Sequence, residues 1–297
     1  MRLRYAVPAL AAAAVLLLSG CVDNSTPSPG SSDGASAPTI AKDEAAAALL
    51  PESIRSAGKL VVGIDPNYAP NEYKDDAGQP VGWAVDLANG FGAKLGLTME
   101  YKASSFDKII PSVLGGTFDI GYSSFTDNPE RQKSVDFVNY YNAGIQWAQP
   151  IGGSLDIDDV CGLTVSVQRT TFQETDMLPA ISEACVSAGK KAVTIEGFET
   201  QAEATNALAV GKADAMVADS PITQYAVSQQ SDKIELAGEA FEVAPYGIAV
   251  DKGNTELRDA IQAALQSMVD DGSYNEILSK WGVESGGIDT ITINAGG

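Results

Sequence analysis

Apolar residues along the first half of the chain alternate between short continuous runs and spaced stripes, as expected for strands followed by helices. Lys59–Ile64 is a short apolar run that predicts a strand. Leu87, Phe91 and Leu95 recur at i, i+4 and i+8 and predict a helix with one buried face. Further strands are predicted at 98–102 and 118–122, with a short helix at 109–114. This first block, to about residue 149, therefore has a βαβαβ character.

The second half of the chain repeats this alternation. Strands are predicted at 163–167, 192–195, 213–218 and 246–250, and helices at 177–188, 200–210, from about 220, at 257–268 and at 274–281. Such alternation predicts mainly parallel sheets covered by helices, and 297 residues suffice for two lobes. The expected fold class is therefore α/β.

The balance of charges narrows the possible functions. The chain has 19 Lys and Arg against 39 Asp and Glu, a formal net charge of -20, and no histidine. A nucleic-acid backbone is bound by clustered cations, so we expect no nucleic-acid partner. The absence of histidine excludes the commonest general base, the Ser–His and Cys–His pairs and most zinc sites. We expect neither a metal nor a cofactor, and enzymes that rely on carboxylates are disfavoured rather than excluded.

The N-terminal residues have the features of an export signal. Arg2 and Arg4 precede the apolar run 6–18, which is too short to cross a bilayer as a helix. Leu18-Ser19-Gly20-Cys21 follows and matches the bacterial lipobox, whose cysteine becomes the lipidated N-terminus. We expect a lipoprotein signal peptide over 1–20 and lipidation of Cys21; the alternative is a plain signal peptide with a coincidental cysteine. The protein would then be extracytoplasmic and anchored to the cell membrane by lipid.

The residues after the lipobox do not have the composition of a folded segment. Residues 21–56 are rich in Ser, Pro and Ala and predict a flexible tether, with the globular part beginning near Ser53.

Two cysteines remain besides Cys21, namely Cys161 and Cys185. An even pair in an oxidising compartment predicts a disulfide, which contributes about 3.5 kcal/mol on the chain-entropy model. Two free buried thiols are the alternative.

Polar and charged side chains follow the predicted strands, at the ends where ligands bind to parallel sheets. They are Asp65 and Tyr68 after residue 64, Ser123, Ser124, Thr126 and Arg131 after 122, Gln168, Thr170 and Thr171 after 167, and Asp219 after 218. One cation among carboxylates, hydroxyls and aromatic rings suits a small zwitterion. A guanidinium binds a carboxylate bidentately, and an ammonium is bound by a carboxylate together with neutral acceptors.

Four segments, in order, resemble bacterial solute-binding protein family 3, the type II periplasmic binding proteins that serve amino-acid ABC transporters. They are Gly82–Leu87, Ser123–Arg131 with its continuation Val135-Asp136-Phe137, Tyr246–Val250 and Asp271–Tyr274, within a likeness that covers about residues 57–283. The resemblance implies two Rossmann-like lobes joined by a two-stranded hinge, with a ligand cleft between them. It implies a first lobe of 57–148 plus 246–297 and a second lobe of 149–245.

The resemblance also implies roles for the residues that would bind the backbone of an amino acid. Arg131 is expected to hold the ligand's α-carboxylate with help from Thr126. Asp219 is expected to accept the α-ammonium, supported by Ser123 and Ser124.

Other positions match those that surround the ligand's side chain. Tyr68 and Phe106 match the aromatic positions that sandwich it, and Asp65 matches the residue that selects it. Glu72 adds another acid, which we expect near the mouth of the cleft.

A loop of the second lobe, Gln168–Gln173, resembles the family's Gln-x-Gly-Thr-Thr-Gln. Gln168 and Thr171 match the pattern and are expected to contact the ligand. Thr170 replaces the glycine and Phe172 replaces a threonine, which suggests a narrower or more apolar pocket.

Each candidate also has a purely structural interpretation. Arg131 could cap a helix at the surface, and Asp219 could N-cap a helix that begins at Ser220-Pro221. Asp65 could be a turn residue before a proline, and Tyr68 and Phe106 could be ordinary core aromatics.

The leading interpretation of function is a monomeric, membrane-anchored receptor that captures a polar or basic amino acid and delivers it to an ABC permease. The lobes would close around the ligand. Two alternatives remain open from the sequence. One is an extracytoplasmic enzyme on the same fold, such as a dehydratase of a cyclic amino-acid precursor, and the other is a ligand-sensing module.

Overall fold

The computed structural model describes residues 40–297, which belong to one compact unit. The predicted signal peptide, Cys21 and the first part of the predicted tether lie outside the described residues. Between residues 40 and 297, no helix combines the length and the apolar character that crossing a membrane requires.

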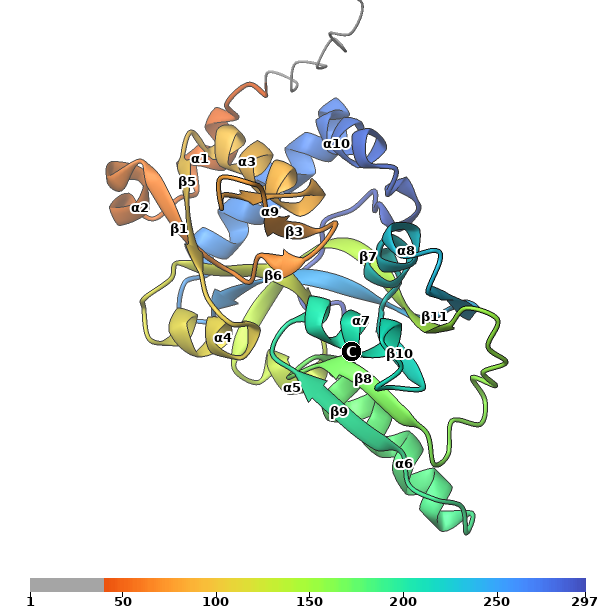
Figure 1. Cartoon of the computed structure of the whole chain (residues 1–297). Helices are drawn as coiled ribbons and strands as arrows, with labels where there is room; N and C mark the ends of the chain where they lie inside the picture. The colour runs from red at the N-terminus through yellow and green to blue at the C-terminus, as the bar shows by residue number, and fades with distance from the viewer. Residues whose placement is uncertain (1–39) are drawn as a thin grey trace, which may run out of the picture. The chain divides into compact units, whose positions relative to one another are not determined.

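A central sheet of eight strands runs through this unit in the order β5-β1-β6-β11-β7-β10-β8-β9 (Figure 1). The strands are β1 (Lys59–Ile64), β5 (Thr98–Ala103), β6 (Ile120–Thr126), β7 (Val135–Pro150), β8 (Thr164–Gln168), β9 (Thr194–Phe198), β10 (Ala215–Asp219) and β11 (Ile234–Asp251). A separate three-stranded sheet contains β2 (Asn67–Tyr68), β3 (Glu72–Lys74) and β4 (Pro80–Val81).

Two long antiparallel strands in the middle of the sheet connect two parallel sets. β5, β1 and β6 are parallel to one another, as are β10, β8 and β9. β7 and β11, of 16 and 18 residues, pair antiparallel with each other and continue from one set into the other. The predicted α/β class is therefore correct. Each parallel set borders a long strand that is antiparallel to it, because β6 pairs with β11 and β10 pairs with β7.

Helices cover the sheet. Those beside the β5-β1-β6 set are α3 (Trp83–Leu95), α4 (Phe106–Leu114), α5 (Pro129–Gln132), α9 (Thr255–Asp271) and α10 (Ser273–Trp281), followed by the short 3-10 turn η2 (Glu284–Gly286). Those beside the other set are α6 (Leu178–Ser187), which a π-helical turn η1 (Gln173–Met177) precedes, α7 (Gln201–Ala209) and α8 (Ser220–Gln229). In Figure 1, α3, α9 and α10 lie at one end of the unit and α6 lies at the other.

The buried apolar side chains form separate cores, and we use them to define a first and a second lobe. The core of the first lobe includes Trp83, Phe91, Tyr122, Tyr140 and Ile261, and that of the second includes Trp147, Val165, Val167, Leu178 and Val217.

Both long strands pass from one core to the other within a few residues. On β7 the change falls between Ala143 and Ile145, and on β11 it falls between Phe241 and Tyr246. The pairing of β7 with β11 shifts register at Phe241, opposite Ile145. The predicted boundary at 245/246 falls within this stretch of β11. The crossing on β7 lies before the predicted boundary at 148/149, because the side chains of Ile145 and Trp147 already pack in the second lobe.

The predicted tether is wrong in its final part. Residues 44–56 include helix α1 (Glu44–Ala48) and most of α2 (Glu52–Ala57) rather than a flexible segment. The carboxylate of Asp43 caps α1 by accepting hydrogen bonds from the amides of Ala45 and Ala46. Ala46 and Leu50 are buried in the core of the first lobe. The globular part therefore begins before Ser53, because an alanine-rich stretch buries small apolar side chains against the lobe.

The predicted disulfide is confirmed. Cys161 and Cys185 form a disulfide with a Cα–Cα distance of 5.5 Å, which closes a sequence separation of 24 residues. The disulfide joins α6 to the segment that precedes β8 in the chain. In the sheet, β10 separates β8 from the long strand β7.

Candidate functional site

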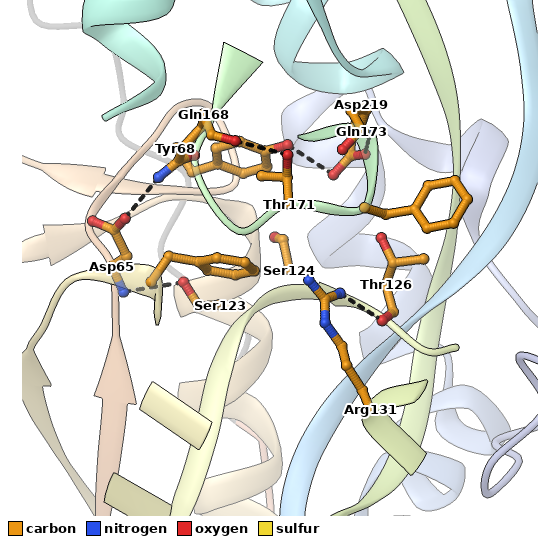
Figure 2. A pocket seen from close by; sticks show the side chains of 12 residues that line it. Asp65, Tyr68, Ser123, Ser124, Thr126, Arg131, Gln168, Thr171, Gln173 and Asp219 are labelled. Carbon is orange, nitrogen blue, oxygen red and sulfur yellow. Dashed lines mark hydrogen bonds between the residues drawn. The ribbon is translucent and has the colours of Figure 1, made fainter. Parts of the chain in front are cut away.

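A cavity lies where the C-terminal ends of β1, β6, β8 and β10 meet. All ten side chains that the sequence predicted for the ligand site line it: Asp65, Tyr68, Phe106, Ser123, Ser124, Thr126, Arg131, Gln168, Thr171 and Asp219. Phe172 and Gln173 complete the lining. Figure 2 shows Asp65 at one end of the cavity, and Arg131 and Asp219 toward the other. The topology therefore brings together residues from four separate strand ends.

Arg131 points its guanidinium into the cavity from the short helix α5. Asn128 caps the start of this helix, because its side-chain oxygen accepts a hydrogen bond from the Arg131 amide at 2.9 Å. The guanidinium donates to the carbonyl oxygens of Thr126 at 2.8 Å and of Thr170 at 3.0 Å. It also lies over the ring of Phe106, 5.5 Å from the centroid. These contacts hold the group in place from both lobes.

The charge of Arg131 is not neutralised by an ion pair. None of the salt bridges within residues 40–297 involves it. Burial lowers the pKa of Arg131 to about 10, so the side chain stays cationic at neutral pH. The surface-cap interpretation therefore fails, because the guanidinium faces a cavity and binds neutral carbonyls. An anionic group entering the cavity would meet an uncompensated cation.

Asp219 ends β10 and faces the same cavity from the second lobe. One carboxylate oxygen accepts hydrogen bonds from the hydroxyls of Tyr68 at 2.8 Å and Tyr246 at 2.7 Å. The other accepts one from the side-chain amide of Gln173 at 2.7 Å. Asp219 occupies the N-cap position of helix α8, but its side chain makes no capping hydrogen bond and is left to face the cavity. Burial raises the pKa of Asp219, an effect that its hydrogen bonds and Arg131 oppose.

Asp65 follows β1 at the other end of the cavity and is 2% exposed. Its carboxylate accepts hydrogen bonds from the side-chain amides of Asn67 and Gln168, the latter at 3.0 Å. Its backbone amide donates to the hydroxyl of Ser123 at 3.0 Å. Burial raises the pKa of Asp65, and its two amide partners oppose the shift. Like Arg131, this buried charge has neutral partners only and is more than a turn residue.

Glu72 lies behind the serines rather than at the mouth of the cleft, where we expected it. Its side chain is fully buried and accepts a hydrogen bond from the hydroxyl of Ser124 at 3.0 Å. Ser124 in turn accepts one from the side-chain amide of Asn71 at 2.9 Å. Burial raises the pKa of Glu72 well above its usual range. The short strand β3 carries this side chain inward, which its polarity gave no reason to expect.

Hydrogen bonds across the cavity hold the two lobes closed. They join Tyr68 and Tyr246 to Asp219, Asp65 to Gln168, and Arg131 to the backbone of Thr170. Thr170 adopts a left-handed backbone conformation, φ +60°, where glycine is favoured and where the resemblance led us to expect one. The side chain of Glu174 accepts a hydrogen bond from the Thr170 amide at 2.6 Å and supports this turn.

Two residues that contact Asp219 were missing from the predicted site. Gln173, which also lines the cavity, is the last residue of the quoted loop, and Tyr246 begins a segment that carried the resemblance, so both signals were present in the sequence. Their roles depend on Asp219, because both donate hydrogen bonds to its carboxylate.

Within residues 40–297, no cluster of three or more His, Cys, Asp or Glu side chains is arranged to hold a metal ion.

Comparison with known proteins identifies the class to which this fold and cavity belong. The sequence model for bacterial extracellular solute-binding proteins, family 3, matches residues 60–284. The chain belongs to this family.

Relatives with assigned roles support the same class. The arginine-binding protein ArgT of Corynebacterium glutamicum is 41% identical over 249 residues, which cover 83% of this chain and 82% of the relative. The ABC transporter glutamine-binding protein GlnH of Bacillus subtilis is 30% identical over 278 residues, which cover 90% of this chain and 93% of the relative. These relatives are solute-binding proteins rather than enzymes.

Solved structures agree with the fold. An ancestral arginine-binding protein bound to arginine superposes with a TM-score of 0.69 at 35% identity, covering 75% of this chain and 98% of that chain. The ancestral amino acid-binding protein AncCDT-1, a precursor of cyclohexadienyl dehydratase, gives a TM-score of 0.67 at 33% identity, covering 77% and 98%. The expected type II periplasmic binding protein fold is confirmed. The protein is an extracytoplasmic solute-binding protein, and not an enzyme.

Proposed function

We propose that this protein captures L-arginine, or a closely similar basic amino acid, outside the cytoplasm and delivers it to an ABC importer. The observation that carries the proposal is the distribution of charge in the cavity. Arg131 and Asp219 lie toward one end and Asp65 lies at the other, and none of the three is neutralised by an ion pair within residues 40–297. An amino acid with a cationic side chain complements all three groups.

The Arg131–Asp219 end suits the part that all α-amino acids share. A carboxylate fits the planar guanidinium fork through two parallel hydrogen bonds. An ammonium donates hydrogen bonds and needs a carboxylate and neutral acceptors, which Asp219 and the serine and threonine hydroxyls supply. Since the closed cavity excludes water, each of these contacts is stronger than in solution.

The Asp65 end suits a cationic side chain. Asp65 pairs with amides that a guanidinium can replace as hydrogen-bond donor, and the rings of Tyr68 and Phe106 line the path toward it. Asp65 also lines a neighbouring pocket with Glu199 and Lys74, so that two acids and one base surround this end. An acidic ligand side chain would meet an excess of negative charge here. The 41% identity to an arginine-binding protein supports the same choice.

Delivery to a permease and attachment to the membrane complete the proposal. The family and its ABC-transporter relatives support a permease partner, and the sequence Leu18-Ser19-Gly20-Cys21 supports lipidation of Cys21. The protein would act as a monomer. Expression of a Cys21→Ala variant in cells tests the anchor. We expect the variant to leave the membrane fraction, and retention there would contradict lipidation.

The ligand is tested by a thermal-shift screen of the wild-type protein against the twenty amino acids, followed by calorimetry with L-arginine. A ligand that binds only the folded state raises the melting temperature. We expect L-arginine to give the largest shift. It should bind one-to-one with micromolar affinity or tighter, which is a binding free energy of about −8 kcal/mol or more negative. A larger shift with L-glutamate or L-leucine than with L-arginine would overturn the proposal.

A further inference from the structure

The last residues of the chain pack beside the loop that carries Arg131. We call residues 292–296 the tail segment; it lies outside the part of the chain that the family matches, 60–284. It runs antiparallel to the first half of β7, through a bridge between Ile293 and Val138. The amide of Asn139 donates to the carbonyl of Thr292 at 2.8 Å. The tail segment thus extends the sheet along an edge of β7 within the first lobe.

The far end of the tail segment is fixed to a buried carboxylate. Asp127 is 2% exposed, and one of its oxygens accepts hydrogen bonds from the amide of Gly296 at 3.0 Å and the side-chain amide of Asn139 at 2.9 Å. Its other oxygen accepts one from the side chain of Gln132 at 2.7 Å. Gln132 also donates to the carbonyl of Gly296 at 2.9 Å. Asp127, Gln132 and Gly296 therefore form one closed hydrogen-bonded group.

This group brackets Arg131. Asp127 directly follows Thr126, whose carbonyl accepts a hydrogen bond from the Arg131 guanidinium, and Gln132 directly follows Arg131 itself. Helix α5 has only four residues, and so short a helix cannot hold its own conformation in water. The contacts to the tail segment supply a support on both sides of Arg131 that the helix lacks.

We propose that the tail segment is a positioning element that holds the Arg131 guanidinium in the geometry needed to bind the ligand's carboxylate. The inference rests on the proposed function for the identity of that carboxylate. The tail segment does not line the cavity that holds Arg131 and acts through the loop 126–132. Loss of the tail contact lets this loop sample other conformations, so that binding must order it again and the affinity falls.

Two neighbouring glycines provide a matched pair of variants. A Cβ on Gly296 would lie 1.9 Å from the backbone oxygen of Asp127, whereas a Cβ on Gly297 meets nothing within 4 Å. Gly296→Ala therefore pushes the tail segment off Asp127, and Gly297→Ala leaves it in place. We expect calorimetry with L-arginine to show at least about a fivefold loss of affinity for Gly296→Ala and no change for Gly297→Ala.

A measurement on the ligand-free protein separates positioning from general damage. In Gly296→Ala, hydrogen exchange of the amides of 127–132 should rise, while that of helix α9 in the same lobe stays at the wild-type level. If Gly296→Ala does not fold, Gln132→Ala removes the same link from the loop side and is expected to behave alike. Unchanged exchange in 127–132, or an equal rise in α9, would overturn the inference.

A double variant tests whether the effect passes through the guanidinium. In an Arg131→Lys background, Gly296→Ala should lower the affinity for L-arginine by less than about twofold further. The full loss in that background would contradict a positioning role. If the wild-type protein does not bind L-arginine, the proposed function fails, and the exchange measurement still decides the inference. The affinity comparison is then made with the amino acid that gives the largest thermal shift.

Discussion

The two ends of the cavity hold their charges differently. At one end, Arg131 and Asp219 come from different lobes, and their partners are backbone carbonyls, two tyrosine hydroxyls and the amide of Gln173. At the other end, Asp65 is a single carboxylate, and its side-chain partners are the neutral amides of Asn67 and Gln168. The first end therefore combines a cation with a carboxylate, and its partners come from both lobes. The second end carries a carboxylate alone, with two neutral side-chain amides as partners.

This difference between the two ends separates affinity for amino acids in general from selection of one amino acid among them. Groups that bind an α-carboxylate and an α-ammonium are the same for every amino acid, so they can be fixed firmly on both lobes. The residue that selects the ligand's side chain has to differ between relatives that bind different amino acids. Asp65 has only two side-chain partners, so a substitution at this position requires few other substitutions. We therefore expect variants at the Arg131–Asp219 end to weaken all amino acids, and variants at the Asp65 end to alter the preference among them.

Removal of the cation should have the largest effect. Arg131→Ala leaves the ligand's carboxylate desolvated without a partner and should lower the affinity for L-arginine and L-glutamine alike, by roughly 3–5 kcal/mol. Calorimetry checks both ligands. Arg169→Ala is the matched control, because Arg169 is exposed and its guanidinium donates to the carbonyl of Gly197 away from the cavity. Unchanged binding of both ligands by Arg131→Ala would show that Arg131 does not bind the ligand's carboxylate.

Asp65→Asn should change the preference rather than abolish binding. The substitution keeps the size of the side chain and removes its charge, so a ligand guanidinium loses a charge-assisted hydrogen bond worth about 1.5–3 kcal/mol. L-glutamine has a neutral side chain and should lose much less. The ratio of the two affinities, measured in the wild type and the variant, is the readout. Equal losses for both ligands would mean that Asp65 does not select the side chain.

The preference for a cationic ligand should also depend on pH. Burial raises the pKa of Asp65, and a bound cation favours its ionised form, so binding of L-arginine releases a proton in the acidic range. Its affinity should therefore fall as the pH decreases through the raised pKa of Asp65. Asp219 also has a raised pKa but serves both ligands, so the arginine-to-glutamine affinity ratio isolates Asp65. If the arginine-to-glutamine affinity ratio, measured in paired titrations, stays the same from pH 7 into the acidic range, Asp65 does not select the cationic side chain.

Tyr246→Phe should produce the smallest of these effects. It removes one of the two hydroxyls that donate to the same oxygen of Asp219, and Tyr68 keeps the other in place. The affinity for every amino acid should fall by about 1 kcal/mol, without a change in preference. Tyr225→Phe on α8, away from the cavity, serves as the control. A change in the arginine-to-glutamine ratio would indicate that the two ends are not independent.

The sequence predicted well those elements whose pattern is local. β1 matches the predicted strand, and α3 and α9 include the predicted stripes, because one buried face leaves a clear period in the sequence. β7 was not predicted as a strand, and β11 was predicted only at 246–250. β7 is buried along nearly its whole length, so no alternation of apolar and polar residues reveals it. The segment 44–56 was read as a tether because its alanines carry little apolar signal.

The candidate site was predicted where motifs identify strand ends, and missed where a contact depends on tertiary packing. Ligands bind beyond the C-terminal ends of parallel strands, so Asp65 and Arg131 could be grouped on one parallel set and Asp219 assigned to the end of a strand in the other. The burial of Glu72 behind Ser124 and the link between Gly296 and Asp127 join segments far apart in the chain. No local period or spacing encodes such contacts.

The most direct test of the account is a crystal structure of the protein with L-arginine. The account predicts the ligand's carboxylate within about 3.2 Å of the Arg131 guanidinium, its ammonium at Asp219 and its guanidinium at Asp65. A ligand bound with its side chain at Arg131, or bound outside this cavity, would contradict it.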